Sequence, residues 1–158
     1  MISLKPATFA VFVTVSAFLV GSSPTLAADK GTTAEAEALV KKAVTFYKAN
    51  GKDKAYAAFN DTKGGYVDRD LYLFCFDFNG VSVAHGANAK LIGKNLIDMA
   101  DIDGNKMIAA MTNIAKTKGK GWHDYKFSNP VSKENEKKSA YVEKFDEDVW
   151  CAAGVYKG

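Results

Sequence analysis

Residues 121–156 have the sequence GWHDYKFSNPVSKENEKKSAYVEKFDEDVWCAAGVY, which contains three segments typical of β-strands. The first, 122–127, is short and rich in aromatic residues, the second covers 139–144, and the third covers 149–156. Polar residues separate the three, and a turn begins at Asn129-Pro130. This stretch predicts a sheet that carries aromatic and basic side chains but no catalytic set, an arrangement suited to recognising a small molecule.

A second group of strands is expected earlier in the chain. Residues 70–78 form a nearly continuous apolar run around LYLFCF, without Gly or Pro. Such a run is typical of a central strand that is buried on both faces. Asn79-Gly80 is a strong hairpin signal, and residues 81–85 form the expected return strand. Apolar residues at helical spacing predict a long helix over 33–49 and a shorter one over 52–60.

Residues 86–120 join the hairpin to the later strands and have no strand character of their own. We expect a loop, a turn or short helix over 91–98, and a helix over 105–116. The order is then two helices, two strands, a long crossing that contains a helix, and three strands. This order is typical of an α+β domain.

The first 27 residues predict a secretory signal peptide. Lys5 is followed by an apolar run over 7–20 and by small residues up to Ala27, after which we expect cleavage. The run is shorter than the about 20 residues that cross a bilayer, so an uncleaved anchor is disfavoured. We therefore expect a periplasmic or secreted protein, not membrane-spanning, with residues 28–158 as one domain.

The charge of the chain excludes some partners. The formal net charge is +3, and loss of Lys5 with the signal peptide lowers it to +2. Lysines are scattered over the sequence and form no concentrated basic stripe. Neither a nucleic acid nor a membrane surface is therefore a predicted partner.

Cys75 and Cys151 leave two states open. An exported chain meets oxidising conditions, in which these residues can form a disulfide if their Cα atoms lie within about 7 Å. Each lies inside an apolar strand, and two buried free thiols fit the sequence equally well. No CxxC or CxxCH spacing is present, which disfavours thioredoxin-like chemistry and covalent haem.

The sequence contains no motif that predicts an enzyme, a metal site or a cofactor. We find no GxSxG, no HExxH and no phosphate-binding glycine loop. Residues 101–105, DIDGN, resemble the start of a calcium loop. A calcium loop requires Gly and Glu at the positions that Lys106 and Thr112 occupy, so we instead expect a polar turn that caps the helix beginning at Asn105.

Several motifs occur in a fixed order over nearly all of residues 35–156: GGYVDRDLYLFCFDFNG, AHGANAKLIGKNLIDMADIDGNKMI, GWHDYKFSNP, KKSAYVEK and GVY. With this combination the chain resembles the single Cache domain family, in its second subtype, of bacterial extracytoplasmic sensor domains. The resemblance implies a PAS-like five-stranded antiparallel sheet with strand order 2-1-5-4-3. It also implies a long amino-terminal helix and a pocket roofed by the segment between the second and third strands.

Members of this family commonly form the outer part of chemoreceptors, histidine kinases or cyclases. The present sequence stops two residues after its last expected strand, so we expect a stand-alone secreted member that acts through a membrane receptor or kinase. Its expected ligand is a small organic molecule such as a short carboxylate. The alternative is a structural or partner-binding PAS-like module whose pocket is filled by its own side chains.

Six residues are expected at the ligand: His85, Trp122, Tyr125, Lys138, Tyr141 and Phe74. The resemblance places the aromatic residues of GWxDY and the Lys and Tyr of KSxYV near it. A carboxylate needs a cation or several donors in a desolvated cleft, which Lys138, His85 and the two tyrosines can supply. Alternatives remain open: His85 and Lys138 can instead be exposed, and the tyrosines can be ordinary core residues.

Strand alternation constrains these residues further. It places Trp122 and Tyr125 on opposite faces, so both line one pocket only where the strand twists or ends. Lys138 and Tyr141 are likewise expected on opposite faces of their strand. His123 faces away from Trp122, and we assign it no ligand role. Aromatic residues of central strands are usually core, so at least two of the three residues Phe74, Phe76 and Trp150 are expected to be core only.

Overall fold

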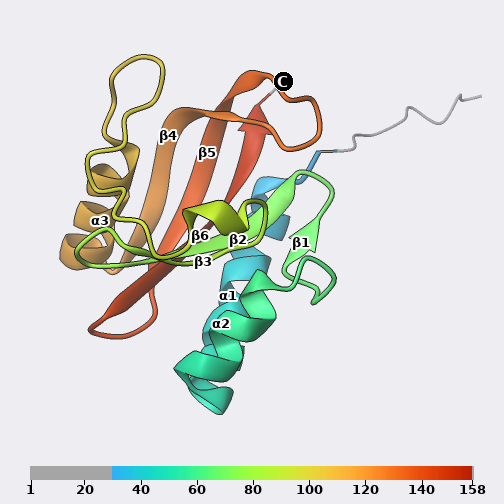
Figure 1. The fold of residues 1–158 in the computed structure, drawn as a ribbon, viewed down its shortest axis with the longest axis vertical. Helices are drawn as coiled ribbons and strands as arrows, with labels where there is room; N and C mark the ends of the chain where they lie inside the picture. Colours follow the sequence, from blue (N-terminus) through green and yellow to red (C-terminus); the bar gives the residue numbers. More distant parts are fainter. Residues whose placement is uncertain (1–29, 158) are drawn as a thin grey trace, which may run out of the picture.

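A computed structural model describes residues 30–157; the predicted signal peptide over 1–27 lies outside the described residues and stays a prediction. The described elements run from the amino-terminal side to the carboxyl-terminal side as follows (Figure 1). They are α1 (Thr33–Asn50), α2 (Lys52–Asn60), β1 (Val67–Asp68), β2 (Leu71–Asp77), β3 (Ser82–His85), the 3-10 turn η1 (Ala89–Leu91), α3 (Met107–Lys118), β4 (Lys120–Ser128), β5 (Asn135–Lys144) and β6 (Val149–Lys157). Among these residues no helix is both long enough and apolar enough to cross a membrane.

The strands form one antiparallel sheet. Strand β3 pairs with β2, which pairs with β6, followed by β5 and β4. Counted along the five predicted strands, this is the order 2-1-5-4-3, so the predicted topology is confirmed. The last strand of the chain lies in the centre of the sheet, which brings the hairpin β2–β3 and the strands β4 and β5 together around β6.

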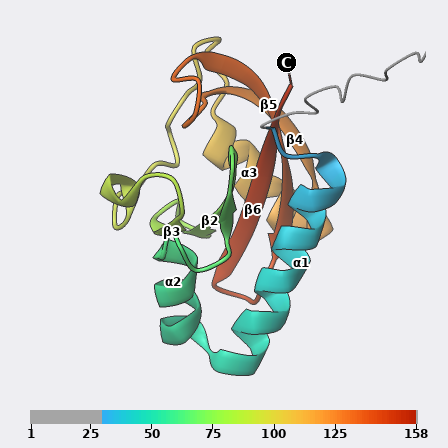
Figure 2. The same ribbon diagram turned by 90° about the vertical axis from the view of Figure 1, so that its right-hand side faces the viewer.

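Helices cover both faces of the sheet (Figure 2). Helix α1 lies across β5 and β6 on one face, and α2 joins it near β3. Helix α3 lies on the other face, against β4 and β5. Strand β2 is buried on both faces: Leu71, Leu73 and Cys75 belong to the core under α1, whereas Tyr72, Phe74 and Phe76 belong to the core under α3. The predicted burial of this strand on both faces is confirmed.

The segment between β3 and α3 forms a roof over the α3 face, and it is anchored to the β2–β3 hairpin. The backbone N–H of Leu96 donates to the carbonyl of Gly80 at 2.8 Å, and that of Ser82 donates to the carbonyl of Lys94 at 3.0 Å. Gly80 has φ of +87°, and a Cβ there would lie 2.5 Å from Cβ of Ile97. Glycine is therefore required both by the hairpin turn and by the close approach of the roof.

Several details differ from the prediction, and the largest shift of a strand boundary is that of β5, which begins at Asn135 and not at residue 139. Strand β1 was not expected; it is a two-residue pairing with β2 that follows a glycine-rich turn, too short to produce a hydrophobic pattern. Helix α3 begins at Met107 instead of residue 105, because Ala100 and Lys106 form an isolated antiparallel bridge that keeps the intervening turn non-helical.

The cysteines are bonded to each other in this structure. Cys75 on β2 and Cys151 on β6 are direct cross-strand partners, with Cα atoms 4.0 Å apart. Both are fully buried in the core beneath α1. Of the two states that the sequence left open, the structure has the disulfide, and it joins the two central strands on the face opposite α3.

Candidate functional site

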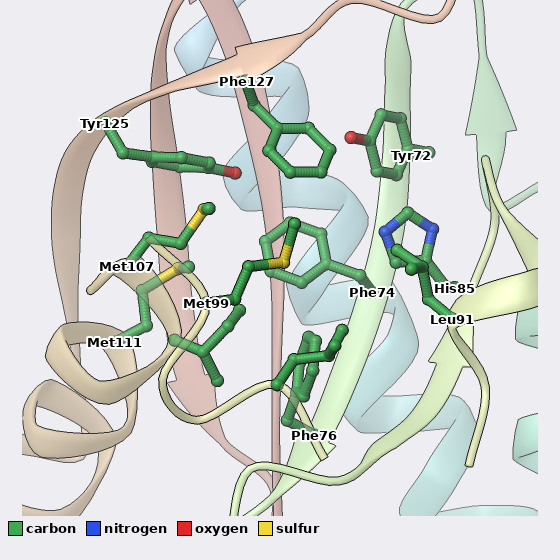
Figure 3. A pocket seen from close by; sticks show the side chains of 12 residues that line it. Tyr72, Phe74, Phe76, His85, Leu91, Met99, Met107, Met111, Tyr125 and Phe127 are labelled. Atoms are coloured by element: carbon green, nitrogen blue, oxygen red, sulfur yellow. The ribbon is translucent and has the colours of Figure 1, made fainter. Parts of the chain in front are cut away.

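A cavity lies on the α3 face of the sheet, between the sheet, the roof and α3 (Figure 3). Its walls come from four sources: β2 and β3, the roof, α3, and β4. The lining residues are Tyr72, Phe74, Phe76, His85, Leu91, Leu96, Met99, Met107, Ile108, Met111, Tyr125 and Phe127. Apolar and aromatic side chains with a few polar groups among them are typical of a small-molecule site.

The cavity is small in this structure. The volume that the centre of a water molecule can occupy in the cavity is about 20 Å³. By the same measure, one buried water needs about 10–15 Å³. The space therefore holds about one water molecule. Met99, Met107 and Met111 line its sides (Figure 3), and because methionine has three rotatable bonds these walls can move to admit a larger molecule.

His85 enters the cavity from the end of β3. Its Nδ1 accepts a hydrogen bond from the backbone N–H of Asn88 at 3.0 Å, and its ring lies against Phe74 with centroids 6.0 Å apart. Burial, with a smaller contribution from Lys138, lowers the pKa of His85 to about 4. The imidazole is therefore neutral at physiological pH, and because Nδ1 is an acceptor, Nε2 carries the proton and is a donor.

Tyr125 on β4 and Tyr72 on β2 direct their hydroxyl groups into the space between the two strands from opposite sides (Figure 3). The Tyr72 hydroxyl lies 3.3 Å from that of Tyr156, which in turn donates to the carbonyl of Ser128 at 2.8 Å. The Tyr125 hydroxyl has no hydrogen-bond partner among residues 30–157. Burial raises the pKa of Tyr125 well above its usual value, so this hydroxyl is an unused donor beside the cavity.

Lys138 on β5 is buried directly behind the cavity wall. Its side chain is 1% exposed, and Nζ lies 3.8 Å from the ring centroid of Tyr72 and 5.7 Å from that of Phe74. Burial lowers the pKa of Lys138 well below 10.5, an effect that the negative charge of Asp70 partly opposes. Lys138 is thus neither exposed nor a direct lining residue: it is a buried amine one side chain away from the cavity.

Trp122 and Tyr141 lie on the other face of the sheet, so the expectation that they share a site with the other four residues is wrong. They are cross-strand partners whose rings pack 5.4 Å apart, and Tyr141 belongs to the core under α1. The reason is register: Tyr125 pairs with Lys138, and Trp122 pairs with Tyr141, so each pair occupies one face. The structure therefore brings together His85, Tyr125, Phe74 and, behind them, Lys138.

The aromatic residues of the central strands are also divided differently from the expectation. Phe74 and Phe76 both line the cavity, and Trp150 is fully buried behind them, stacked on Phe76 with centroids 5.3 Å apart. Only one of the three is therefore core alone. The prediction did not include Tyr72 or the methionines; the apolar spacing of Met107 and Met111, four residues apart on one helix face, was the available signal.

Residues 101–105 form a structural turn, as predicted, but the turn does not cap α3: the N-cap residue of that helix is Lys106, which makes no side-chain capping hydrogen bond. Asp101 Oδ1 accepts hydrogen bonds from the backbone N–H groups of Asp103 and Asn105, both at 2.9 Å, and Oδ2 accepts one from the N–H of Lys126 at 3.1 Å. The turn is thereby fixed to β4. Within residues 30–157, no cluster of three or more His, Cys, Asp or Glu side chains has the arrangement of a metal site.

A PAS-like sheet with a cavity beneath a roof, lined by apolar side chains and a few polar ones, is the architecture of small-molecule sensor domains. Comparison of the sequence with known families agrees with this class: residues 14–156 match the Single Cache domain 2 family. The chain belongs to this family. Cache domains are sensory modules of chemoreceptors and sensor kinases.

One curated relative is the sensor histidine kinase MctS of Rhizobium johnstonii, which is 34% identical over 89 residues. The match covers 56% of the present chain but only 19% of that kinase, so the chain spans about a fifth of the relative's length. The remaining four fifths of the kinase have no counterpart in this match.

Solved structures of chemotaxis proteins have the same fold. A methyl-accepting chemotaxis protein from Vibrio parahaemolyticus is 25% identical with a TM-score of 0.67, covering 78% of this chain and 86% of that one. A Cache chemosensory domain that recognises carboxylic acids is 26% identical with a TM-score of 0.68, covering 79% and 92%. A periplasmic sensor domain of a chemotaxis protein, at 22% identity and a TM-score of 0.64 over 79% and 90%, supports the fold alone.

Proposed function

We propose that this protein is a periplasmic sensor that binds a short carboxylate in the cavity and acts through a membrane receptor or kinase. The observation that carries the proposal is the buried amine of Lys138 beside the cavity, with no acidic side chain of residues 30–157 within ion-pair distance. A buried amine is costly unless it meets a negative group. A ligand carboxylate would be such a group.

The donors around the cavity suit a carboxylate. Within residues 30–157, Nε2–H of His85 and the hydroxyl of Tyr125 have no hydrogen-bond partner, and they lie on opposite walls of the cavity. A carboxylate has two oxygen atoms that each accept hydrogen bonds. Phe74, Phe76 and the methionines would surround a short alkyl or keto chain. Lys138 would act mainly through its charge, because the ring of Tyr72 lies against its amine.

The comparisons support the same ligand class. The similar Cache chemosensory domain recognises carboxylic acids, and its fold overlaps most of the present chain. A membrane receptor or kinase is the natural partner because the family's domains belong to chemoreceptors and sensor kinases. On this basis we assign the binding role to His85, Tyr125, Phe74 and Lys138.

Calorimetric titration of the purified protein with acetate, propionate, lactate and pyruvate tests the proposal. Tyr125→Phe and Tyr141→Phe form a matched pair, since both tyrosines are buried but only Tyr125 lines the cavity. We expect binding of at least one acid, weakened by Tyr125→Phe and unchanged by Tyr141→Phe. The proposal fails if none of the four acids binds, or if both variants weaken binding equally.

The small volume of the cavity favours one alternative, a structural or partner-binding module whose interior is filled by its own side chains. In that case none of the acids would bind, and none would raise the unfolding temperature of the protein. A true ligand stabilises the folded state in proportion to the logarithm of its concentration above Kd. Thermal unfolding at increasing concentrations of each acid therefore distinguishes the two functions.

A further inference from the structure

The amine of Lys138 is buried, and no acidic side chain in the described part of the chain forms an ion pair with it. Its Nζ lies 3.8 Å from the ring centroid of Tyr72 and 4.5 Å from that of Tyr156, and 3.4 Å from the hydroxyl oxygen of Tyr156. Among the ion pairs of residues 30–157, none includes Lys138, whereas Lys126 pairs with Asp103 and Lys157 pairs with Asp124. The side chain is therefore held in place by aromatic rings and not by an opposite charge.

The titratable groups that face this amine come from each neighbouring element. They are Asp70 before β2, Tyr72 on β2, His85 on β3, Tyr125 on β4 and Tyr156 on β6. Burial keeps the three tyrosines protonated by raising their pKa values, and it keeps His85 neutral. Asp70 is the one acid of this set.

Asp70 does not neutralise the amine directly. One of its carboxyl oxygens, Oδ1, accepts the backbone N–H of Gly31 at 2.6 Å, and the other, Oδ2, has no hydrogen-bond partner. The two side chains form no ion pair within 4.0 Å. An anion that enters the cavity would thus be a new negative charge close to Lys138 in a region of low dielectric constant, where such charges interact strongly.

We propose that the carboxylate enters the cavity together with a proton, which the amine of Lys138 accepts, so that the site takes up a carboxylic acid with no net change in charge. This inference rests on the proposed function. A buffer acid releases the proton, the lone pair of Nζ forms the new N–H bond, and no bond of the ligand breaks. Binding of the anion and protonation of the amine then favour each other, because each removes the cost of burying the other alone.

This coupling predicts a defined pH dependence. The amine has a higher pKa in the complex than in the free protein, so a proton is taken up at any pH between these two values. Within that window Kd increases by up to about tenfold for each unit rise in pH. Below the window the amine is already protonated in both states, and Kd is constant.

Isothermal titration in phosphate and in Tris at one pH measures the number of protons taken up on binding, because the two buffers have different heats of ionisation. With whichever of acetate, propionate, lactate or pyruvate binds, we expect uptake of up to one proton and a Kd that rises with pH. Lys138→Met and Lys138→Arg should bind without uptake, since Met has no proton site and Arg is always charged. His85→Gln should retain the uptake, and thermal unfolding verifies that each variant is folded.

Two results would overturn this inference but leave the proposed function intact. One is binding with the same heat in both buffers and a constant Kd between pH 6 and 9. The other is proton uptake that persists in Lys138→Met, which would assign the proton to another group. If none of the four acids binds at any pH, both the proposed function and the coupling are wrong.

Discussion

Replacing Lys138 with Met should stabilise the folded protein while it weakens carboxylate binding. The two side chains have similar length and flexibility, so Lys138→Met retains the packing against Tyr72 and removes the amine. Burial of an uncompensated polar group costs about 1–3 kcal/mol in proteins. The hydrogen bond to Tyr156, at 3.4 Å, is too long to offset this cost. We expect the free energy of unfolding to rise by at least about 1 kcal/mol at pH 7.

The pH dependence of this effect has a definite sign. Burial lowers the pKa of Lys138 in the folded state below 10.5, so the unfolded chain binds more protons than the folded one at pH values between the two pKa values. The stability of the wild type therefore rises with pH in this window, by up to about 1.4 kcal/mol per unit. Lys138→Met lacks this dependence. Its advantage should be largest at low pH and should decrease as the pH approaches 10.

Urea unfolding of the wild type, Lys138→Met and Lys137→Met between pH 6 and 10 measures how the free energy of unfolding of each variant differs from that of the wild type. Lys137 is the matched control because it is the preceding residue on β5 but is exposed. Its replacement should change the free energy of unfolding by less than about 0.5 kcal/mol. A Lys138→Met variant that is less stable than the wild type, or whose difference from it does not vary with pH, would refute the interpretation of Lys138 as an uncompensated buried amine.

Tyr125→Phe should leave the free energy of unfolding within about 0.5 kcal/mol of the wild type, because the hydroxyl has no partner among residues 30–157. The same substitution should weaken carboxylate binding by about 10- to 100-fold, which titration calorimetry would measure. Replacing Cys75 and Cys151 with Ala should lower the free energy of unfolding by about 4 kcal/mol, since the bond closes a loop with a sequence separation of 76; a urea midpoint unaffected by reductant in the wild type would contradict this. Gly154→Ala should lower the free energy of unfolding by about 1–3 kcal/mol in a urea titration, because the new Cβ would lie 2.5 Å from Cε of Lys138. An unchanged free energy of unfolding would mean that the Lys138 side chain can shift away from residue 154.

Most of the fold could be predicted because its signals are local. The LYLFCF run, the Asn79-Gly80 turn and the spacing of apolar residues in the first helix each depend on neighbouring residues only, and all three gave the observed elements. Strand order came from the family resemblance, because pairing between distant strands leaves no local pattern. Strand β1 was missed for a related reason: a two-residue strand is too short to alternate.

The site was predicted only in part because strand alternation fixes relative faces and not absolute ones. Alternation correctly separated Trp122 from Tyr125 and Lys138 from Tyr141. It could not indicate which member of each pair faces the cavity, since this depends on which side of the sheet α1 occupies. His123 illustrates the same limit: it shares the face of Tyr125, with rings 6.0 Å apart, but the cavity does not extend to it.

The surroundings of Lys138 favour a functional origin for its burial. Gly154 on β6 lies beside the side chain of Lys138, which belongs to β5. A Cβ at position 154 would lie 2.5 Å from Cε of Lys138, so β6 leaves room for the lysine only because residue 154 has no side chain. Glycine within a strand weakens the sheet, and a buried amine without a counter-ion destabilises the fold. Two unfavourable features that fit each other are hard to explain by packing, since a larger residue at 154 and an apolar one at 138 would fill the same space. They are explained if the site must present an amine to a ligand that carries the missing negative charge.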